Sequence, residues 1–265
     1  MSKARKDFRV DSLAVQIYDS ETELALSAAT IIQQDLQQIL KHKQTATVLF
    51  ATGNSQLKFL DALASLNNID WSRIVCFHLD EYLGISENHP SSFRYYLRER
   101  IEKPISPQKF HYIQGDILEP LQECERYSKL LTAQDIDLCM LGIGENGHLA
   151  FNEPTVANFK DPLQVKLVKL DSVNHQQQVN QGHFPNIESV PKYAFTLTIP
   201  MICAAKKIVC LAPGKGKAKL VKQLLEGNIT QKFPASILRN QPQANLLLDT
   251  ESASLVDSEQ RTVIN

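Results

Sequence analysis

The sequence has no long apolar run, which bears first on membrane association. Although 43% of its 265 residues are hydrophobic, no segment approaches the ~18 consecutive apolar residues that a membrane-spanning helix needs. The N-terminal segment MSKARKDFRVDSLAV carries basic residues but no apolar core behind them, so we expect no signal peptide. A protein without a membrane partner is therefore predicted.

Cysteine and histidine lack the spacings that hold metals or disulfides. The five cysteines are an odd number without a C-x-x-C pair, and the seven histidines show no H-x-x-x-H spacing. We therefore expect no structural zinc and no bound metal. The cysteines are interpreted as reduced thiols packed mostly in strands, which is typical of a cytoplasmic protein.

The sequence also lacks an excess of one charge. Its 28 Lys and Arg residues against 29 Asp and Glu residues give a net charge of −1, which argues against nucleic acid as a partner. No Gly/Ser/Pro-rich linker, repeat or low-complexity tract divides the chain. We expect a single domain over residues 1–265, long enough to bury its own core without a metal or disulfide.

Strand and helix patterns alternate along the chain. Ser20 and Glu23 resemble a capping box at the start of a helical pattern, and nearly continuous apolar runs are typical of strands covered on both faces. Predicted strands cover residues 46–51, 74–79, 136–143, 165–170, 194–199, 207–212 and 244–249; predicted helices cover residues 20–41, 91–101, 120–131 and 217–226, with one more from Ser55. This pattern predicts an α/β fold: one doubly wound, mostly parallel, Rossmann-like sheet flanked by helices. Ligands of such sheets bind beyond the carboxyl ends of the strands.

Two polar turns lie between a predicted strand and a predicted helix. The first is ATGNS, in which exposed N–H groups, a glycine and two hydroxyls could cradle an anion or simply cap the helix. The second is PGKGK at residues 213–217, whose lysine could reach the same anion or lie in a solvated basic turn.

Two adjacent carboxylates, Asp80 and Glu81, follow the strand predicted at residues 74–79. Neighbouring side chains at a strand end cannot point the same way, so one could face a cleft and the other the protein. Taken alone, the pair is better explained as a solvated acidic turn.

A glycine loop, GIGENGHLAFNEP, follows the strand predicted at residues 136–143. It contains a formal G-x-G-x-x-G, but Asn-Glu-Pro at residues 152–154 would break the helix that a dinucleotide fingerprint needs. The loop is instead predicted to place His148 beside Glu153. A nearby carboxylate would fix the tautomer of the imidazole and raise its pKa, as proton transfer requires; otherwise the histidine is an ordinary surface residue.

Together, four segments resemble the glucosamine-6-phosphate deaminase/isomerase family. They are ATGNS, HLDEYLGISENHPSSF, DLCMLGIGENGHLAFNEP, and AFTLTIP followed by KIVCLAPGKGKAKL. They stand in family order over nearly the whole chain, and FNEP separates this family from the related 6-phosphogluconolactonases. The resemblance implies a cofactor-free enzyme that converts an amino-sugar phosphate, foremost glucosamine-6-phosphate, into fructose-6-phosphate and ammonia.

The resemblance also implies roles for individual residues. Asp80 would be the base that moves a proton between the first and second carbons, and His148, with Glu153 as its partner, would open the pyranose ring. Asn146 stands where some members carry an aspartate in the catalytic relay. The residues implied at the phosphate site are Thr52, Gly53, Asn54, Ser55 and Lys217.

One departure from the family concerns the phosphate. The arginine expected after the fifth strand is missing, since LDSVNHQQQVNQGHF contains none. This leaves two alternatives open: a lactonase or other sugar-phosphate enzyme on the same scaffold, and a non-catalytic sugar-phosphate sensor. FNEP and the Asp80–Glu81 pair disfavour the first, and Asp80, His148 and Glu153 disfavour the second. A homo-oligomer is compatible with the sequence, which does not fix the oligomeric state.

Overall fold

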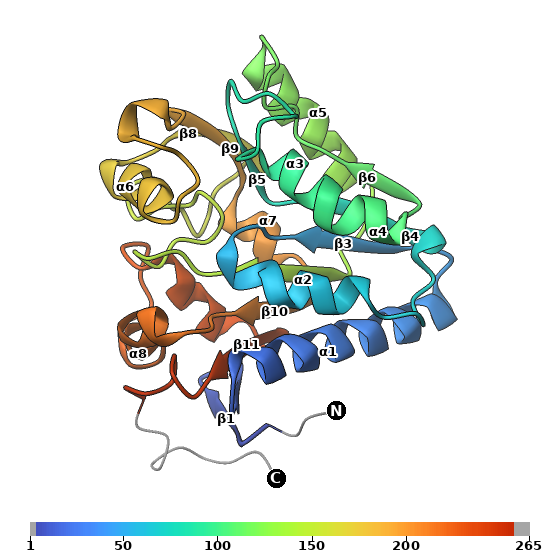
Figure 1. The fold of residues 1–265 in the computed structure, drawn as a ribbon, viewed down its shortest axis with the longest axis vertical. Helices are drawn as coiled ribbons and strands as arrows, with labels where there is room; N and C mark the ends of the chain where they lie inside the picture. The colour runs from blue at the N-terminus through green and yellow to red at the C-terminus, as the bar shows by residue number, and fades with distance from the viewer. Residues whose placement is uncertain (1–3, 257–265) are drawn as a thin grey trace.

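An eight-stranded sheet runs through the computed structural model, which describes residues 4–256 (Figure 1). Its strands are β1 (Lys6–Val10), β2 (Leu13–Tyr18), β3 (Ala46–Phe50), β4 (Ile74–His78), β6 (Lys109–His111), β7 (Leu138–Gly142), β10 (Lys207–Leu211) and β11 (Ala244–Asp249). They lie in the order β1-β2-β11-β10-β7-β3-β4-β6, and only the β1–β2 hairpin is antiparallel. The predicted α/β fold with a mostly parallel sheet is confirmed.

A smaller antiparallel sheet stands beside the large one (Figure 1). It consists of β5 (Asp80–Tyr82), β9 (Tyr193–Leu197) and β8 (Val165–Lys169), with β9 in the middle. The interpretation of the acidic pair as a solvated turn is therefore wrong. These residues form a strand because β9, more than a hundred residues away in the sequence, pairs with them.

Helices cover both faces of the large sheet. They are α1 (Glu21–His42), α2 (Leu57–Ala64), α3 (Phe93–Leu97), α4 (Lys103–Ile105), α5 (Pro120–Thr132), α6 (Ser172–Asn180), α7 (Ile199–Cys203) and α8 (Ala218–Glu226), with a π-helical turn, Arg98–Glu102, between α3 and α4. Ser20 is the N-cap of α1, because its Oγ accepts the N–H of Glu23 at 3.2 Å. The Glu23 carboxylate accepts the N–H of Asp19 at 3.3 Å, one residue before the position that a capping box uses.

The central strands are apolar on both faces because both faces pack against helices. In β3, Val48 and Phe50 belong to a buried cluster that includes residues of α1 and α2, whereas Leu49 belongs to a second cluster with Tyr127 of α5. Successive side chains of a strand point to opposite faces, so an unbroken apolar run is what a sandwiched strand requires.

The predictions for cysteine and for membrane spans can also be compared with the structure. All five cysteines are free thiols, and Cys76, Cys139 and Cys210 lie in strands, so this prediction is confirmed. In residues 4–256 no helix is long and apolar enough to cross a membrane. The single domain over residues 1–265 stays a prediction.

Candidate active site

Four neighbouring strands of the large sheet bring the predicted site residues to one edge. β10, β7, β3 and β4 are consecutive in the sheet and parallel, so the turns after them meet beyond their carboxyl ends. A cavity of about 290 Å³ lies there. Seven predicted residues line it: Thr52, Gly53, Asn54, Ser55, Asp80, His148 and Lys217. The other two, Asn146 and Glu153, are not part of its lining.

The turn after β3 exposes backbone N–H groups at the start of a helix. Gly53 adopts φ +99°, a conformation that favours glycine, and a short 3₁₀ turn at residues 54–56 continues into α2. Ser55 lies close to β7, since a Cβ added at Gly142 would come within 3.1 Å of its hydroxyl. This geometry suits an anion held by main-chain donors.

Lys217 connects the turn after β10 to the glycine loop after β7. Its ammonium donates to the carbonyl of Ile143 at 2.7 Å. Burial lowers the pKa of Lys217 below its usual value, because water no longer solvates the charge. An anion in the cavity would favour the charged form and offset that cost.

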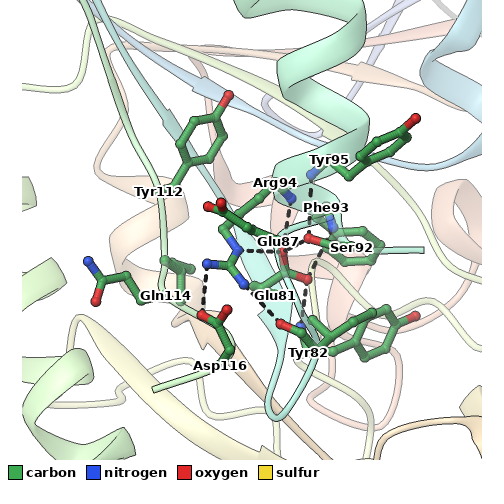
Figure 2. A network of polar contacts seen from close by, with 12 residues as sticks. Glu81, Tyr82, Glu87, Ser92, Phe93, Arg94, Tyr95, Tyr112, Gln114 and Asp116 are labelled. Atoms are coloured by element: carbon green, nitrogen blue, oxygen red, sulfur yellow. Dashed lines mark hydrogen bonds and ion pairs between the residues drawn. The ribbon is translucent and has the colours of Figure 1, made fainter. Parts of the chain in front are cut away.

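Asp80 and Glu81 point to opposite sides of β5. Asp80 lines the cavity, whereas Glu81 is fully buried and accepts four hydrogen bonds (Figure 2). The donors are Ser92 Oγ at 2.7 Å and the backbone N–H groups of Tyr82 at 2.9 Å, Phe93 at 3.1 Å and Arg94 at 2.9 Å. One carboxylate thus faces the cavity and the other the protein, as the sequence allowed.

The environment of Asp80 favours its protonated form. Burial first, and the neighbouring Glu81 second, raise the pKa of Asp80 well above its usual range. On the far side of Glu81, the Arg94 guanidinium lies 3.6 Å from the Glu81 carboxylate and 3.0 Å from that of Asp116 (Figure 2). The buried network therefore fixes β5 from behind while Asp80 meets the cavity.

His148 packs flat on the glycine loop. A Cβ added at Gly144 would lie 2.0 Å from ring atoms of His148, so only glycine leaves room for the imidazole. Asn146 Oδ1 lies 2.7 Å from His148 Nδ1 and also accepts the backbone N–H of His148 at 3.2 Å. We therefore assign the ring hydrogen to Nδ1, which leaves Nε2 as the basic nitrogen.

The prediction that Glu153 raises the pKa of His148 is wrong. Burial first and the Lys217 ammonium second lower the pKa of His148 to about 4, and Asp171 opposes them. Glu153 is fully buried, and its Oε2 accepts the backbone N–H of Asp171 at 3.1 Å. The neighbour that fixes the tautomer is Asn146. The spacing of residues in the loop does not determine which side chain turns toward the ring.

The segment after the glycine loop is fastened to the small sheet. Asn152 Nδ2 donates to the carbonyls of Leu149 at 2.9 Å and Leu197 at 2.7 Å. No helix follows the third glycine, because the next regular element is β8. The prediction that Asn-Glu-Pro at residues 152–154 breaks any helix there is thereby confirmed.

One wall of the cavity was not predicted from the sequence. Gln177, Gln178, Gln181 and His183, from α6 and the loop after it, also line the cavity. Gln177 Oε1 accepts the backbone N–H of Glu145 at 3.3 Å, which joins α6 to the glycine loop. The lining contains no arginine. In residues 4–256 no cluster of three or more His, Cys, Asp or Glu side chains could hold a metal ion.

Comparison with known proteins identifies relatives over most of the chain. The family of glucosamine-6-phosphate isomerases/6-phosphogluconolactonase matches residues 19–247. Glucosamine-6-phosphate deaminase 1 of Bacillus subtilis (strain 168) is 39% identical over 82% of this chain and 90% of its own length. The glucosamine-6-phosphate deaminase of Thermoanaerobacter pseudethanolicus is 35% identical over 89% of this chain and 92% of its own.

Solved structures give the same relationship. A monomeric glucosamine-6-phosphate deaminase superimposes with a TM-score of 0.84 at 35% identity, covering 91% of this chain and 99% of that one. The 6-phosphogluconolactonase of Thermotoga maritima, at 18% identity and a TM-score of 0.74 over 89% and 99% of the two chains, shares the fold.

Proposed function

Because the chain belongs to the family of glucosamine-6-phosphate isomerases and 6-phosphogluconolactonases, we propose that it is a glucosamine-6-phosphate deaminase. It converts glucosamine-6-phosphate and water into fructose-6-phosphate and ammonia, without a cofactor. The observation that carries this proposal is the meeting of Asp80, His148 and the residue 52–55 turn in one cavity. A carboxylate base, an imidazole and an anion cradle are the groups that this reaction needs.

His148 opens the sugar ring. Its neutral imidazole takes the proton of the C1 hydroxyl at Nε2, the C1–O5 bond breaks as C1 becomes an aldehyde, and the same proton passes to O5. The lowered pKa of His148 supports this role, because a ring that is already neutral can accept the proton. Asn146 holds the tautomer throughout.

Asp80 then moves a proton along the open chain. Its carboxylate takes the proton from C2 and returns it to C1, while the aldehyde oxygen takes a proton from the substrate's own ammonium. C1 thereby becomes a hydroxymethyl group and C2 an iminium, which water hydrolyses to the ketone and ammonia. A raised pKa makes Asp80 a stronger base but leaves less of it ionised. The amine of the substrate arrives as an ammonium beside it, and this positive charge favours the carboxylate.

The phosphate lies at the turn formed by residues 52–55 and beside Lys217. Main-chain N–H groups hold its oxygens and one ammonium balances its charge. No arginine lines the cavity, so the positive charge beside the phosphate comes from Lys217. The glutamines of α6 are placed to contact sugar hydroxyls.

Release of ammonia and fructose-6-phosphate from glucosamine-6-phosphate by the purified protein tests this function. We expect the two products in equal amounts and no release of ammonia from unphosphorylated glucosamine at the same concentration. We also expect 6-phosphogluconolactone to hydrolyse no faster with the protein than without it. Lactone hydrolysis without ammonia would show that the scaffold serves the other activity of the family. Binding without any turnover would make the protein a sensor.

A cytoplasmic location, for which the free cysteines argue, and a homo-oligomer stay predictions.

A further inference from the structure

Asp249, the last residue of β11, contacts the turn that carries Lys217. β11 lies beside β10 in the large sheet (Figure 1), and this turn follows β10. Both carboxylate oxygens of Asp249 accept the backbone N–H of Gly214, at 3.1 Å for Oδ1 and 3.0 Å for Oδ2. The end of one strand therefore holds the turn after the neighbouring strand. The family resemblance implies no role for Asp249.

The Asp249 carboxylate is buried at the end of a mostly apolar strand. Asp249 is 3% exposed, and the three leucines before it, residues 246–248, are fully buried. A carboxylate in such a place is costly unless hydrogen-bond donors satisfy it. Its donors are main-chain groups, because the backbone N–H of Ser252 also donates to Oδ1, at 2.7 Å. The charge is thus tolerated by holding two segments of backbone.

Asp249 is itself fixed by the segment that follows β11. Ser252 Oγ accepts the backbone N–H of Asp249 at 3.1 Å and donates to its carbonyl at 3.2 Å. The backbone N–H of Ala253 donates to the same carbonyl at 3.0 Å. The carboxylate therefore cannot turn away from Gly214 without also losing its bond to Ser252.

Gly214 transmits this fixed position to Lys217. It adopts φ +91° and ψ 152°, a conformation that is strained for any residue with a Cβ. Its carbonyl accepts the backbone N–H of Lys217 at 2.9 Å. The Lys217 ammonium then donates to the carbonyl of Ile143 at 2.7 Å and lines the cavity. Printed hydrogen bonds thus lead from Asp249, through one glycine, to the residue that carries the cation.

The turn after β3 shows what Asp249 changes, because the two turns are built alike. Gly53 has φ +99° and ψ 171°, and each glycine is followed by a three-residue 3₁₀ turn and then a helix. In the described residues, 4–256, the N–H of Gly53 has no acceptor, so it can bind an anion. The N–H of Gly214 is engaged by Asp249. The first turn therefore offers main-chain donors, and the second offers an ammonium on a fixed base.

We propose that Asp249 is a positioning residue for phosphate binding, which holds the turn after β10 so that the Lys217 ammonium reaches the cavity. This inference rests on the phosphate site of the proposed function. Asp249 does not touch the phosphate. It limits the conformations of the turn before the anion arrives, so that less entropy is lost when the anion binds.

Asp137 offers the comparison that separates positioning from stability. It is also 3% exposed, and its Oδ2 accepts the backbone N–H of Thr47 at 3.0 Å. It precedes β7, however, and so lies at the amino ends of the parallel strands, away from the cavity. Loss of either carboxylate leaves buried N–H groups unpaired and lowers stability. Only loss of Asp249 should weaken the binding of phosphate.

The experiment compares Asp249→Ala with Asp137→Ala. Calorimetry of the substrate-free proteins with inorganic phosphate gives the affinity, and steady-state kinetics give kcat and KM for glucosamine-6-phosphate. For Asp249→Ala we expect both the dissociation constant and KM to rise roughly tenfold, the lower end of what loss of a charged hydrogen bond costs, with kcat unchanged. Asp137→Ala should melt at a lower temperature but keep both binding constants. Equal constants in the two variants, or tighter phosphate binding by Asp249→Ala, would overturn the proposal.

A double variant tests whether Asp249 acts through Lys217. Because the turn matters only for the lysine that it carries, Asp249→Ala should add nothing to the loss of phosphate affinity in Lys217→Ala. Additive losses would refute this route.

Gly214→Ala tests the turn while Asp249 stays in place, and it decides the matter if Asp249→Ala does not fold. A Cβ at Gly214 meets no atom within 4 Å, so the substitution strains the backbone without a clash, and we expect weaker phosphate binding here too. Wild-type affinity would refute the role of the turn even in an active deaminase. Weakened phosphate binding in a protein that releases no ammonia would refute the proposed function but not the positioning by Asp249.

Discussion

The cavity has two walls that are built differently. The strand-end wall consists of the turns after β3, β4, β7 and β10, where residues 52–55, Asp80, His148 and Lys217 are held by main-chain geometry and close packing. The α6 wall consists of Gln177, Gln178, Gln181 and His183 on a short polar helix and its loop. The first wall offers a base, an imidazole and a cation, and the second offers mainly amides.

This difference indicates a division of labour. Proton transfer needs groups held at fixed distances, which the ends of packed strands provide. Amide side chains neither titrate nor carry charge, so the α6 wall can contact hydroxyls without taking part in proton transfer. We expect substitutions in the strand-end wall to lower kcat or phosphate binding strongly, and substitutions in the α6 wall to change KM modestly.

The largest effect is expected for Asp80→Asn. The amide keeps the shape of the side chain but cannot take the proton from C2, so kcat should fall by roughly 10²–10⁴-fold. The folded-state pKa of Asp80 is raised, so its carboxylate costs stability at neutral pH, and the variant should melt at the same or a higher temperature. Ammonia release and thermal unfolding measure the two effects. The control, Asp61→Asn on the exposed face of α2, should change neither; a residual rate above a tenth of wild type would move the base to another group.

The strand-end wall was also the part that the sequence predicted. Its turns follow nearly continuous apolar runs, which are typical of strands covered on both faces. The turns after such parallel strands meet at one edge of the sheet, so the place of this wall could be predicted from the sequence. The α6 wall could not be predicted in this way, because its helix has only two apolar residues, Val173 and Val179, and shows no 3.6-residue apolar period. Asp171, as an N-cap three residues before Asn174, was the one local signal of its start.

The remaining errors have a similar cause. β5 exists because β9 pairs with it from far along the chain, and no local pattern of three polar-rich residues predicts such a strand. The expected contact between Glu153 and His148 failed because five residues of irregular loop can turn either way. Here Glu153 turns toward Asp171, while Asn146 reaches the ring.

Lys217→Ala should show that the strand-end wall binds phosphate through one cation. Hydrogen bonds to charged groups contribute about 1.5–3 kcal/mol, so KM for glucosamine-6-phosphate should rise roughly 10–100-fold. Affinity for unphosphorylated glucosamine should not change, and this comparison is the measurement. Lys215→Ala is the matched control, because Lys215 lies in the same turn but is exposed and outside the cavity lining. A variant that distinguishes the two sugars as well as wild type does would assign phosphate recognition elsewhere.

Glu81→Gln should shift the pH dependence rather than abolish activity. Glu81 raises the pKa of Asp80, so removing its charge lowers that pKa and moves the acid limb of kcat/KM to lower pH. The amide also replaces one of the two acceptor oxygens of Glu81 by an NH₂ donor, which would face backbone N–H groups such as those of Tyr82 or Arg94. Each N–H group left unpaired should cost roughly 1–3 kcal/mol of unfolding free energy. A pH–rate profile and denaturant unfolding measure both. An unshifted acid limb in a destabilised variant would restrict Glu81 to holding β5 in place.

The smallest effect is expected in the α6 wall, where Gln178→Ala and Gln176→Ala form a matched pair. Both residues lie on α6, but Gln178 is buried and lines the cavity whereas Gln176 is exposed. Losing one neutral hydrogen bond to a sugar hydroxyl costs about 0.5–1.5 kcal/mol, so Gln178→Ala should raise KM by up to roughly tenfold with kcat unchanged, while Gln176→Ala should behave as wild type. A change in KM alone is the sign of an interaction made equally in the ground and transition states. If kcat instead fell as far as in Asp80→Asn, the α6 wall would carry part of the chemistry, and the distinction between the two walls would not hold.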